Sequence, residues 1–431
     1  IHVSQPHERT GHAKRYSFDS SWAQWMDFGG HFRDVDRNWQ TPTTSITNQD
    51  RTQQDAYVNF NRLTFLPMTY KTTRDRTVTP SAFRSNTNAL VSFLDEGRVD
   101  HVNNLSTAKL IIPKLPVVDF SYNNDRTENT ITQRRELADT VNVGATYAPT
   151  VMLDMLPGKR LTFRPLPTSM TYLYSYKITR LRFPGLERLN EFNISTAPFS
   201  STNLTQFKDE HESRLAFRPW NGFTFNPTYR IRTETEEREF REDELILTPA
   251  AGDIDRRKIP RSISQTAGTS GNLRLLGWLD PRYSYSVTGT ETNNLPTQTD
   301  PNAFDRKTIT RNSDGELSTA IQVNQIVPKV KLTQSMNINT SYRLENGDTY
   351  NDVPKEFEWR SKLWIGNPLD ISSGTRVDLT DRRTFRTNVA WHPLSAYTLA
   401  NRFRPLKTMS LTSNFLRTTE DAETTGTTRR T

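Results

Sequence analysis

The sequence contains no cysteine, which excludes disulfide bonds and thiolate metal sites. The absence of cysteine suits an outer-membrane or periplasmic protein that avoids stray oxidation, although many cytosolic proteins also lack it. Long hydrophobic runs are missing as well. The longest are broken early, as in Lys109–Val118 (KLIIPKLPVV), and none approaches the ~18 residues of a membrane-spanning helix. We therefore expect no helical membrane span within these 431 residues.

A signal peptide is also absent from the printed sequence. Its first residues, IHVSQPHERTGHAKRY, include no apolar core segment and no initiating methionine. Because an exported protein needs such a signal, we expect the chain to be a mature or internal part of a longer protein.

Hydrophobic residues are scarce, at 33% with a mean hydropathy of −0.73, which raises the question of disorder. The aromatic content of 10%, with 22 Phe, 14 Tyr and 8 Trp, argues against disorder. Transmembrane β-strands need an apolar residue only at every second position, and aromatic residues suit membrane interfaces. The composition therefore fits a membrane β-barrel.

The net charge of +8 makes nucleic acid one conceivable partner. However, the 56 basic residues are spread along the chain among 48 acidic ones, without an arginine-rich block. We therefore predict no nucleic-acid partner and interpret the charges as belonging to a solvated or lumenal surface.

An alternating pattern runs from Arg214 to Glu239 and is typical of a strand with one apolar and one polar face. In a soluble sandwich the apolar face would meet a core, whereas in a membrane barrel it would meet lipid. If the strand belongs to a membrane barrel, we predict that Phe217, Phe223, Phe225 and Tyr229 face lipid. It assigns lumen-facing positions to Arg164, Arg218, Arg230, Arg232, Arg386 and Arg404.

A short unit, an aromatic residue followed by Arg-Pro, recurs before such strands at 163–165, 217–219 and 403–405. Proline has a φ angle preset for turns and no N–H to donate to a strand partner. Pro165, Pro219 and Pro405 are therefore predicted to lie in tight turns between antiparallel strands. Related Leu-Pro turns are expected at Pro67 and Pro116.

The opposite ends of the strands are predicted to open into long polar loops. Turn signals at Asn346-Gly347 and Ser313-Asp314-Gly315 support this assignment. The resulting fold class is all-β, an antiparallel transmembrane β-barrel or part of a large one, with roughly fourteen to eighteen strands. Short turns would lie on one side and long polar loops on the other. The expected loops are 123–139, 200–213, 233–261, 290–316 and 344–356.

The order of motifs in the N-terminal third resembles the SprA (Sov) family, the outer-membrane translocons of type IX secretion and gliding motility. The segment SWAQWMDFGGHFRDVDRNWQT (Ser21–Thr41) is a strand pattern of small and aromatic residues ending in a basic segment. Asn48–Ser81 then reaches a Leu-Pro turn, and Leu90–Gly97 and Leu115–Thr130 follow. The resemblance covers residues 1–150, whereas 151–431 resembles barrel hairpins in general, including those of lipopolysaccharide-transport barrels.

This resemblance implies a passive protein-conducting channel in the bacterial outer membrane. Its partners would be outer-membrane lipids, secreted protein cargo, and gating or plug proteins of the secretion machinery. Because family members are far longer than 431 residues, the chain would be a single β-barrel region (1–431) of a longer protein, or a short relative.

No catalytic signature is present in the sequence, which has no G-x-S-x-G, P-loop or G-x-G-x-x-G motif. His7 and His12 lack the spacing of a zinc-binding helix. We therefore predict a non-enzymatic protein without cofactor or metal. Two alternatives to the channel stay open: a lipid-handling barrel of the lipopolysaccharide-transport kind, and a soluble all-β surface or structural protein.

Overall fold

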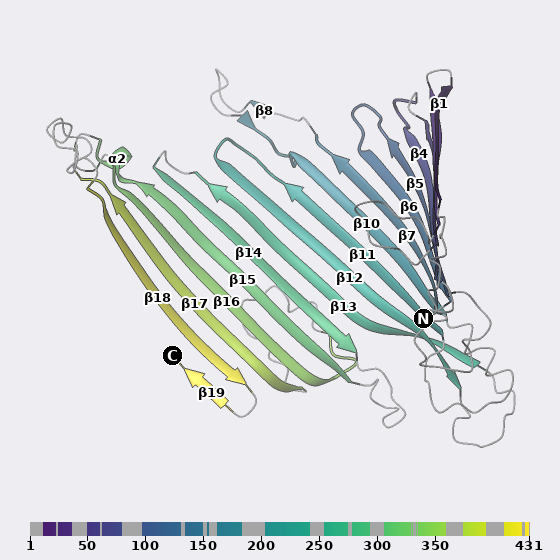
Figure 1. The fold of residues 1–431 in the computed structure, drawn as a ribbon. Coiled ribbons are helices and arrows are strands. Elements are labelled where there is room, and N and C mark those ends of the chain that lie inside the picture. The colour runs from purple at the N-terminus through teal and green to yellow at the C-terminus, as the bar shows by residue number, and fades with distance from the viewer. Residues whose placement is uncertain are drawn as a thin grey trace, which may run out of the picture. The chain divides into compact units, whose positions relative to one another are not determined.

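The computed structural model is built almost entirely from β-strands (Figure 1). It describes residues 12–22, 25–36, 50–60, 63–79, 97–130, 134–149, 153–154, 162–182, 203–241, 254–274, 278–293, 306–328, 330, 333, 335–358, 374–393, 409–424 and 427–430. Seventeen strands belong to one sheet, and two short strands form a separate pair. The all-β antiparallel fold class is confirmed, and the size of the large sheet falls within the expected range. None of the helices among the described residues is long and apolar enough to span a membrane.

The chain divides into two compact units. The first consists of residues 1–145, 173–209 and 234–259, and its pairings join strands that follow one another in sequence. Its strands are β1 (Ala13–Trp22), β2 (Met26–Val35), β3 (Asp50–Phe60), β4 (Met68–Thr79), β5 (Gly97–Leu110), β6 (Val117–Asn129) and most of β7 (Arg134–Tyr147).

The second unit consists of residues 146–172, 210–233 and 260–431, and repeats this antiparallel pairing of consecutive strands. It contains β8 (Leu153–Asp154), β9 (Thr162–Phe163), β14 (Leu279–Asn293), β15 (Arg306–Gln322), α2 (Val323–Ile326), β16 (Asn337–Pro354), β17 (Thr375–Trp391), β18 (Leu411–Thr424) and β19 (Thr427–Arg430). Besides β7, four strands contribute residues to both units: β10 (Ser169–Arg182), β11 (Asn203–Ala216), β12 (Phe223–Arg241) and β13 (Ile254–Leu273).

Proline turns connect strands where the sequence predicts them. Leu66 N donates a hydrogen bond to Leu63 O in the β3–β4 turn, and Leu115 N donates to Ile112 O in the β5–β6 turn. Pro219 lies in the bend between β11 and β12. Pro165 follows β9, and the N–H of its neighbour Arg164 donates to Pro219 O at 2.8 Å, so two of the Arg-Pro units meet. Pro405 lies outside the described residues.

The predicted residue ranges of the long polar loops are wrong. Strands occupy much of every predicted loop, since β6 continues to Asn129, β11 begins at Asn203 and β16 runs to Pro354. Asn346-Gly347 and Ser313-Asp314-Gly315 are not turns but paired strand residues, with Asn346 opposite Ser313. These polar segments form strands because neighbouring strands supply their backbone hydrogen bonds, which composition does not reveal.

The connections still differ between the two ends of the strands. Short connections, such as 111–116, 217–222 and 274–278, join β5 to β6, β11 to β12 and β13 to β14. At the other ends β4 stops at Thr79 and β5 starts at Gly97, and β14 stops at Asn293 and β15 starts at Arg306. The rule has exceptions, because β6 and β7 are separated only by 130–133. Below, "turn end" and "loop end" refer to these two ends.

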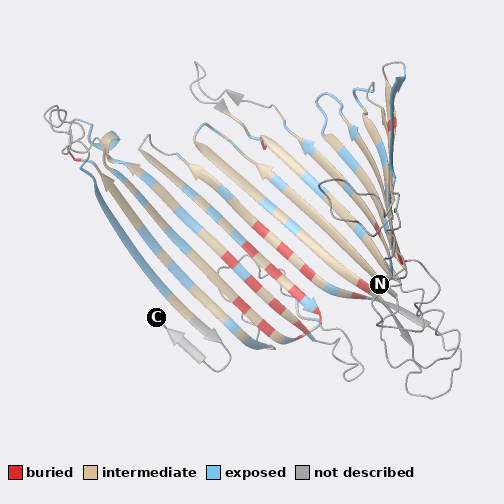
Figure 2. Ribbon diagram, in the orientation of Figure 1, coloured by how far each residue is buried: buried red, intermediate tan, exposed pale blue. Residues whose placement is uncertain are grey.

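A small buried cluster lies in the second unit (Figure 2), formed by Ala267, Val287, Ile309, Tyr350 and Val353 on β13–β16. Tyr229, Tyr285 and Phe357 pack against it. Next to the cluster, the Lys307 ammonium lies 3.1 Å from the Glu291 carboxylate and donates to the carbonyl oxygens of Lys355 and Phe357 at 2.9 and 2.8 Å. The segment that follows β16 is thus tied to the strands beneath it.

Candidate functional site: the two faces of the sheet

One face of the first unit carries an apolar band at the turn end of its strands, and we call it the band face. The antiparallel register places directly paired residues on the same face, so Tyr16 lies beside Phe32 and Val58 beside Tyr70. On β1 the band covers Tyr16 to Trp22, about seven of the 9–11 residues with which a tilted strand crosses a bilayer. Its members are Tyr16, Phe18, Trp22, Met26, Phe28, Phe32, Ala56, Val58, Phe60, Met68, Tyr70, Ala108, Leu110, Val118 and Phe120.

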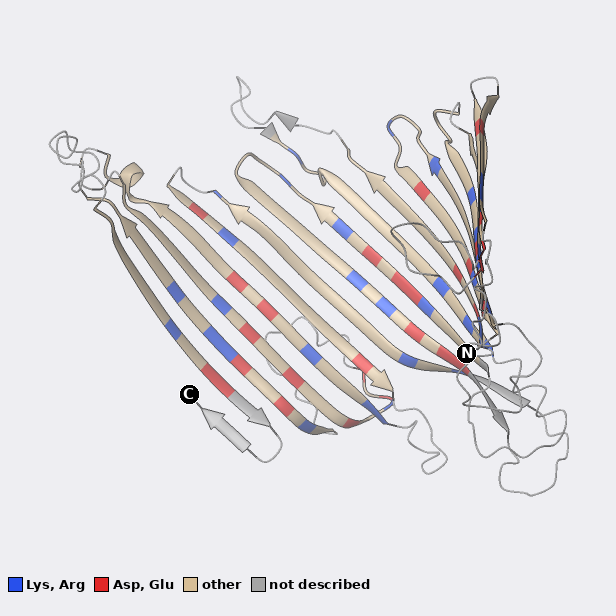
Figure 3. Ribbon diagram, viewed as in Figure 1, with Lys and Arg blue, Asp and Glu red and all other residues tan. Residues whose placement is uncertain are grey.

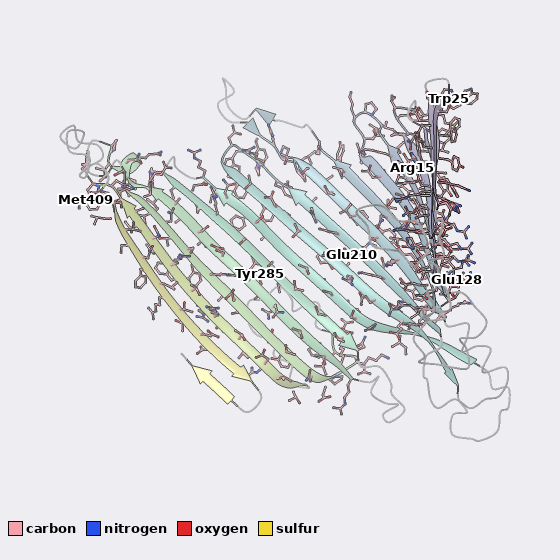
Figure 4. All side chains as sticks on the ribbon, in the orientation of Figure 1. Arg15, Trp25, Glu128, Glu210, Tyr285 and Met409 are labelled. Carbon is pink, nitrogen blue, oxygen red and sulfur yellow. The ribbon has the colours of Figure 1, made fainter. Side chains whose placement is uncertain are left out.

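Aromatic residues of the band are well exposed. Tyr16, Phe18 and Trp22 have exposed fractions of 62%, 56% and 58%. Ring pairs tie neighbouring positions together, with Phe18 and Phe28 at 5.6 Å and Trp22 and Trp25 at 5.4 Å between centroids. Figure 4 marks Trp25 in the turn between β1 and β2. A contiguous apolar surface of this kind marks a place where the protein meets lipid or a partner.

The opposite face of the first unit, which we call its polar face, is predominantly polar, with isolated apolar residues such as Val99 and Leu105. Cross-strand contacts pair its charges: His31 Nδ1 lies 2.8 Å from Asp55 Oδ2, and Arg51 binds Asp75 through both Nε and Nη2 at 3.1 and 2.5 Å. Further pairs are His101–Asp125 at 3.3 Å and Lys109–Asp119 at 3.4 Å. The Tyr57 hydroxyl donates to Asp19 at 2.7 Å. Such a face suits water and not a hydrocarbon core.

A cluster of charges occupies the band face beyond the band, toward the loop end; we call it the arginine cluster. Asp100 accepts two hydrogen bonds from Arg74, at 3.0 and 2.6 Å, and another from Arg98. Arg126 donates to Glu128 at 3.1 Å.

The second unit repeats the two-faced arrangement. Leu317 pairs with Tyr342, which pairs with Phe385, and this face carries apolar residues at the turn end. Its band consists of Leu279, Tyr283, Tyr285, Leu317, Ile321, Ile338, Tyr342, Leu344, Phe385, Val389, Trp391, Leu411 and Phe415. Figure 3 shows most charged residues of β15–β18 gathered toward the loop end, and Figure 4 marks Tyr285 on β14.

The polar face of the second unit is rich in Ser, Thr and Asn near the turn end and in ion pairs beyond. Arg343 contacts Asp314 at 2.9 Å and Glu345 at 2.8 Å, and Arg382 contacts Glu345 at 3.8 Å. Among the residues described in both units, no three His, Asp or Glu side chains gather closely enough to hold a metal ion.

The aromatic residues singled out in the sequence lie on or next to the band face. Tyr229 accepts a hydrogen bond from Gln265 Nε2 at 2.5 Å, which places it on the face of Ala267 and Val287, with Phe223 and Phe225 at alternate positions. The Phe217 and Phe225 backbones are bridged, and their rings are 6.0 Å apart. Their contact with lipid stays a prediction. Tyr229 in addition packs against the buried cluster.

The six singled-out arginines do not form one group. Arg386 lies on the polar face opposite Ser341 and Leu416, and Arg230 pairs with Glu210 at 2.7 Å. Arg232 follows Arg230 at the next position with the same orientation on β12. Arg164 and Arg218 flank the proline turns, and Arg404 lies outside the described residues. Their lumenal role also stays a prediction.

Sequence reasoning missed the arginine cluster and most band residues. The cluster unites residues of β4, β5 and β6, so its recognition requires the strand register. The band members carry a local signal, because apolar residues alternate with polar ones in their strands as they do in Arg214–Glu239.

Comparisons with known proteins give little further information. No protein-family model matches the chain, and no significant match was found among curated proteins. Among solved structures it is similar to the alcaligin outer-membrane receptor FauA of Bordetella pertussis (9% identity, 97% of this chain and 65% of that chain, TM-score 0.35). It is also similar to the iron transporter FrpB of Neisseria meningitidis (9%, 96% and 72%, 0.35). A third is the hemophore receptor HasR of Serratia marcescens (11%, 97% and 71%, 0.35). At these TM-scores and identities, nothing that those proteins bind is carried over to this chain.

Proposed function

We propose that the chain is an outer-membrane β-barrel protein, or part of one, and that it forms the wall of a passive protein-conducting channel. The observation that carries the proposal is the difference in side-chain polarity between the two faces of each unit. One face exposes an apolar, aromatic-rich band at the turn end, and the other is predominantly polar. This arrangement suits a wall that contacts lipid on one face and water on the other.

A soluble sandwich is a weaker explanation for the same strands. Its apolar face would need a second sheet packed about 10 Å away. Phe18, Leu317 and Phe415 keep exposed fractions of 54–56%, and among the described residues none of the band members is buried. The buried apolar cluster begins beyond the band, at Ala267 and Val287.

The proposed cargo is protein, as in the SprA-like translocons that the first 150 residues resemble. Two properties support a wide aqueous path. Seventeen strands in one sheet are as many as large porins use to enclose water. Among the described residues of the polar faces, apolar side chains such as Leu105 and Leu416 are isolated between polar neighbours and form no cluster that would bind an extended chain firmly.

Membrane assembly tests the lipid-facing role of the band. Phe120 lies in the band, and Ser121 is the next residue on the opposite face. Phe120→Arg should prevent the protein from remaining in the outer-membrane pellet after a carbonate wash, because arginine on the lipid-facing surface of a barrel is destabilising, by up to roughly 2–4 kcal/mol at the bilayer midplane. Ser121→Arg introduces the same charge on the polar face and should be retained.

Equal retention of both variants, or release of the unaltered protein by carbonate, would contradict a lipid-facing band. The channel itself is tested in planar bilayers by adding polyethylene glycols of increasing size. A protein-conducting pore should admit polymers as large as a small folded domain. Exclusion of all but the smallest polymers would leave an outer-membrane barrel that does not conduct protein.

A further inference from the structure

The arginine cluster is placed on the same face as the apolar band and beyond its edge. Along β4, Met68 and Tyr70 belong to the band, Thr72 follows, and Arg74 is next on that face. From Tyr70 to Arg74 the strand advances roughly 13 Å. At the usual tilt of 35–45° for a barrel strand, this places the Arg74 backbone about 10 Å farther along the barrel axis than the Tyr70 backbone. With the band in the hydrocarbon layer, as proposed above, Arg74 then lies in the headgroup layer.

The cluster is organised so that its arginines converge. In the cross-strand row Arg74–Val102–Arg126, two guanidinium groups flank a small apolar side chain. The next row contains Asp100 and Glu128, and Arg98 completes the lining of a cavity of about 250 Å³. Asp100, with only 9% of its side chain exposed, fixes Arg74 and Arg98 from beneath.

The cluster has donors to spare for an anion. Arg74, Arg98 and Arg126 keep exposed side-chain fractions of 44%, 37% and 44%, although each binds a carboxylate. A guanidinium has five N–H donors, and the contacts above use at most two in each case. With Arg76, which is exposed in the row of Asp100, four arginines face two carboxylates, a net charge of +2.

We propose that the arginine cluster binds the phosphate of a membrane lipid headgroup in the leaflet on the loop side of the sheet. This inference rests on the proposed function, because the cluster meets headgroups only if the band meets lipid. Arginine matches phosphate through paired N–H donors, and its contact is strengthened where lipid excludes water. Val102 and the band below would accommodate the apolar part of the same molecule.

The test measures how tightly the full chain holds an anionic lipid. The purified protein is transferred to mixed micelles of phosphatidylcholine and phosphatidylglycerol, and bound phosphatidylglycerol is counted by native mass spectrometry. Arg74→Gln/Arg126→Gln should weaken binding roughly thirtyfold, since each arginine near an anionic surface contributes about a fivefold effect. Arg33→Gln/Arg51→Gln removes the same charge from the polar face and should bind as the unaltered protein does.

The outcomes are distinct. Equal weakening by both double variants would indicate general charge attraction and overturn the site, as would no weakening by either. Displacement of the lipid by an equal concentration of inorganic phosphate would show a free-anion site instead of a lipid site. Arg126→Gln alone leaves both arginines on Asp100 and should still weaken binding about fivefold, which keeps the test decisive if the double variant misfolds.

Failure of this inference can be told from failure of the proposed function. If carbonate releases the unaltered protein, both fail. If the protein stays embedded but binds phosphatidylglycerol equally with and without the cluster, only the lipid site is wrong.

Discussion

At the scale of single residues, the contribution of an ion pair to stability depends on whether its side chains are exposed to solvent. Arg51 and Arg74 both make bidentate contacts with aspartate, yet they lie on opposite faces of the sheet. Exposed ion pairs of this type contribute little stability, typically below about 1 kcal/mol. Lys307 differs, because its side chain is only 5% exposed and its partner Glu291 only 10%.

Lys307 supplies the residue-scale prediction. Lys307→Met should destabilise the protein by about 3–5 kcal/mol, because it removes the buried ammonium that binds the Glu291 carboxylate and two carbonyl oxygens. The neighbouring Arg306 is 63% exposed, and Arg306→Met should change stability by less than about 0.5 kcal/mol. Urea unfolding in lipid vesicles measures both, and similar midpoints for the two variants would disprove the tethering role of Lys307.

At the scale of strands, close backbone approach fixes how neighbours pair. Thr224 of β12 and Asn272 of β13 exchange side-chain and backbone hydrogen bonds, with Asn272 N donating to Thr224 Oγ1 at 3.0 Å. Gly271 makes this approach possible, since a Cβ atom there would lie 2.0 Å from the carbonyl oxygen of Thr224. Glycine inside a strand often marks such a contact.

Gly271→Ala is accordingly expected to separate β12 from β13 locally and to cost at least the 1–3 kcal/mol of an overpacked core. Gly315→Ala is the matched control, because its nearest neighbour would be a ring carbon of Tyr285 at 3.3 Å and not a backbone atom. The fraction of protein that resists protease after refolding into vesicles should fall only for Gly271→Ala. An equal loss in both variants would argue against a specific role for this contact.

Strands are also where sequence-based prediction succeeded and failed. Alternation and proline identified β12 and the turns at Pro67, Pro116 and Pro219, because these signals are local. For the polar continuations of β15 and β16 the sequence predicts loops, because Ser313, Gly315, Asn346 and Gly347 also satisfy the rules for turns. Backbone hydrogen bonds from the neighbouring strand hold these residues in strands, and the local sequence does not reveal that neighbour. The arginine cluster was missed for the same reason, since Arg74, Asp100 and Arg126 are brought together only by register.

At the scale of the molecule, charge balance on the polar face determines what a pore would select. In the first unit this face bears five basic residues and six acidic ones on β1–β6. The basic residues are Arg15, Arg33, Arg51, Lys71 and Lys109, and the acidic residues are Asp19, Asp27, Asp55, Asp75, Asp119 and Asp125. Near-balance of this kind produces only a weak mean field in the lumen.

Weak ion selectivity is therefore predicted for the reconstituted channel. The reversal potential under a KCl gradient should lie near zero for the unaltered protein. Asp75→Asn/Asp125→Asn leaves five basic residues against four acidic ones and should shift the potential toward anion preference. Strong selectivity in the unaltered protein, or no shift in the variant, would mean that this face does not line the conducting path.

The paired charges on the polar face of the first unit also affect how strongly a passing polymer binds to that face. A side chain gliding over Arg51 or His31 meets a group whose carboxylate partner is already within about 3 Å. To bind there it would have to displace that partner and the water around it, for little net gain. A channel wall of this kind stays hydrated and binds a passing polymer only weakly, so a long polymer could slide along it without becoming trapped.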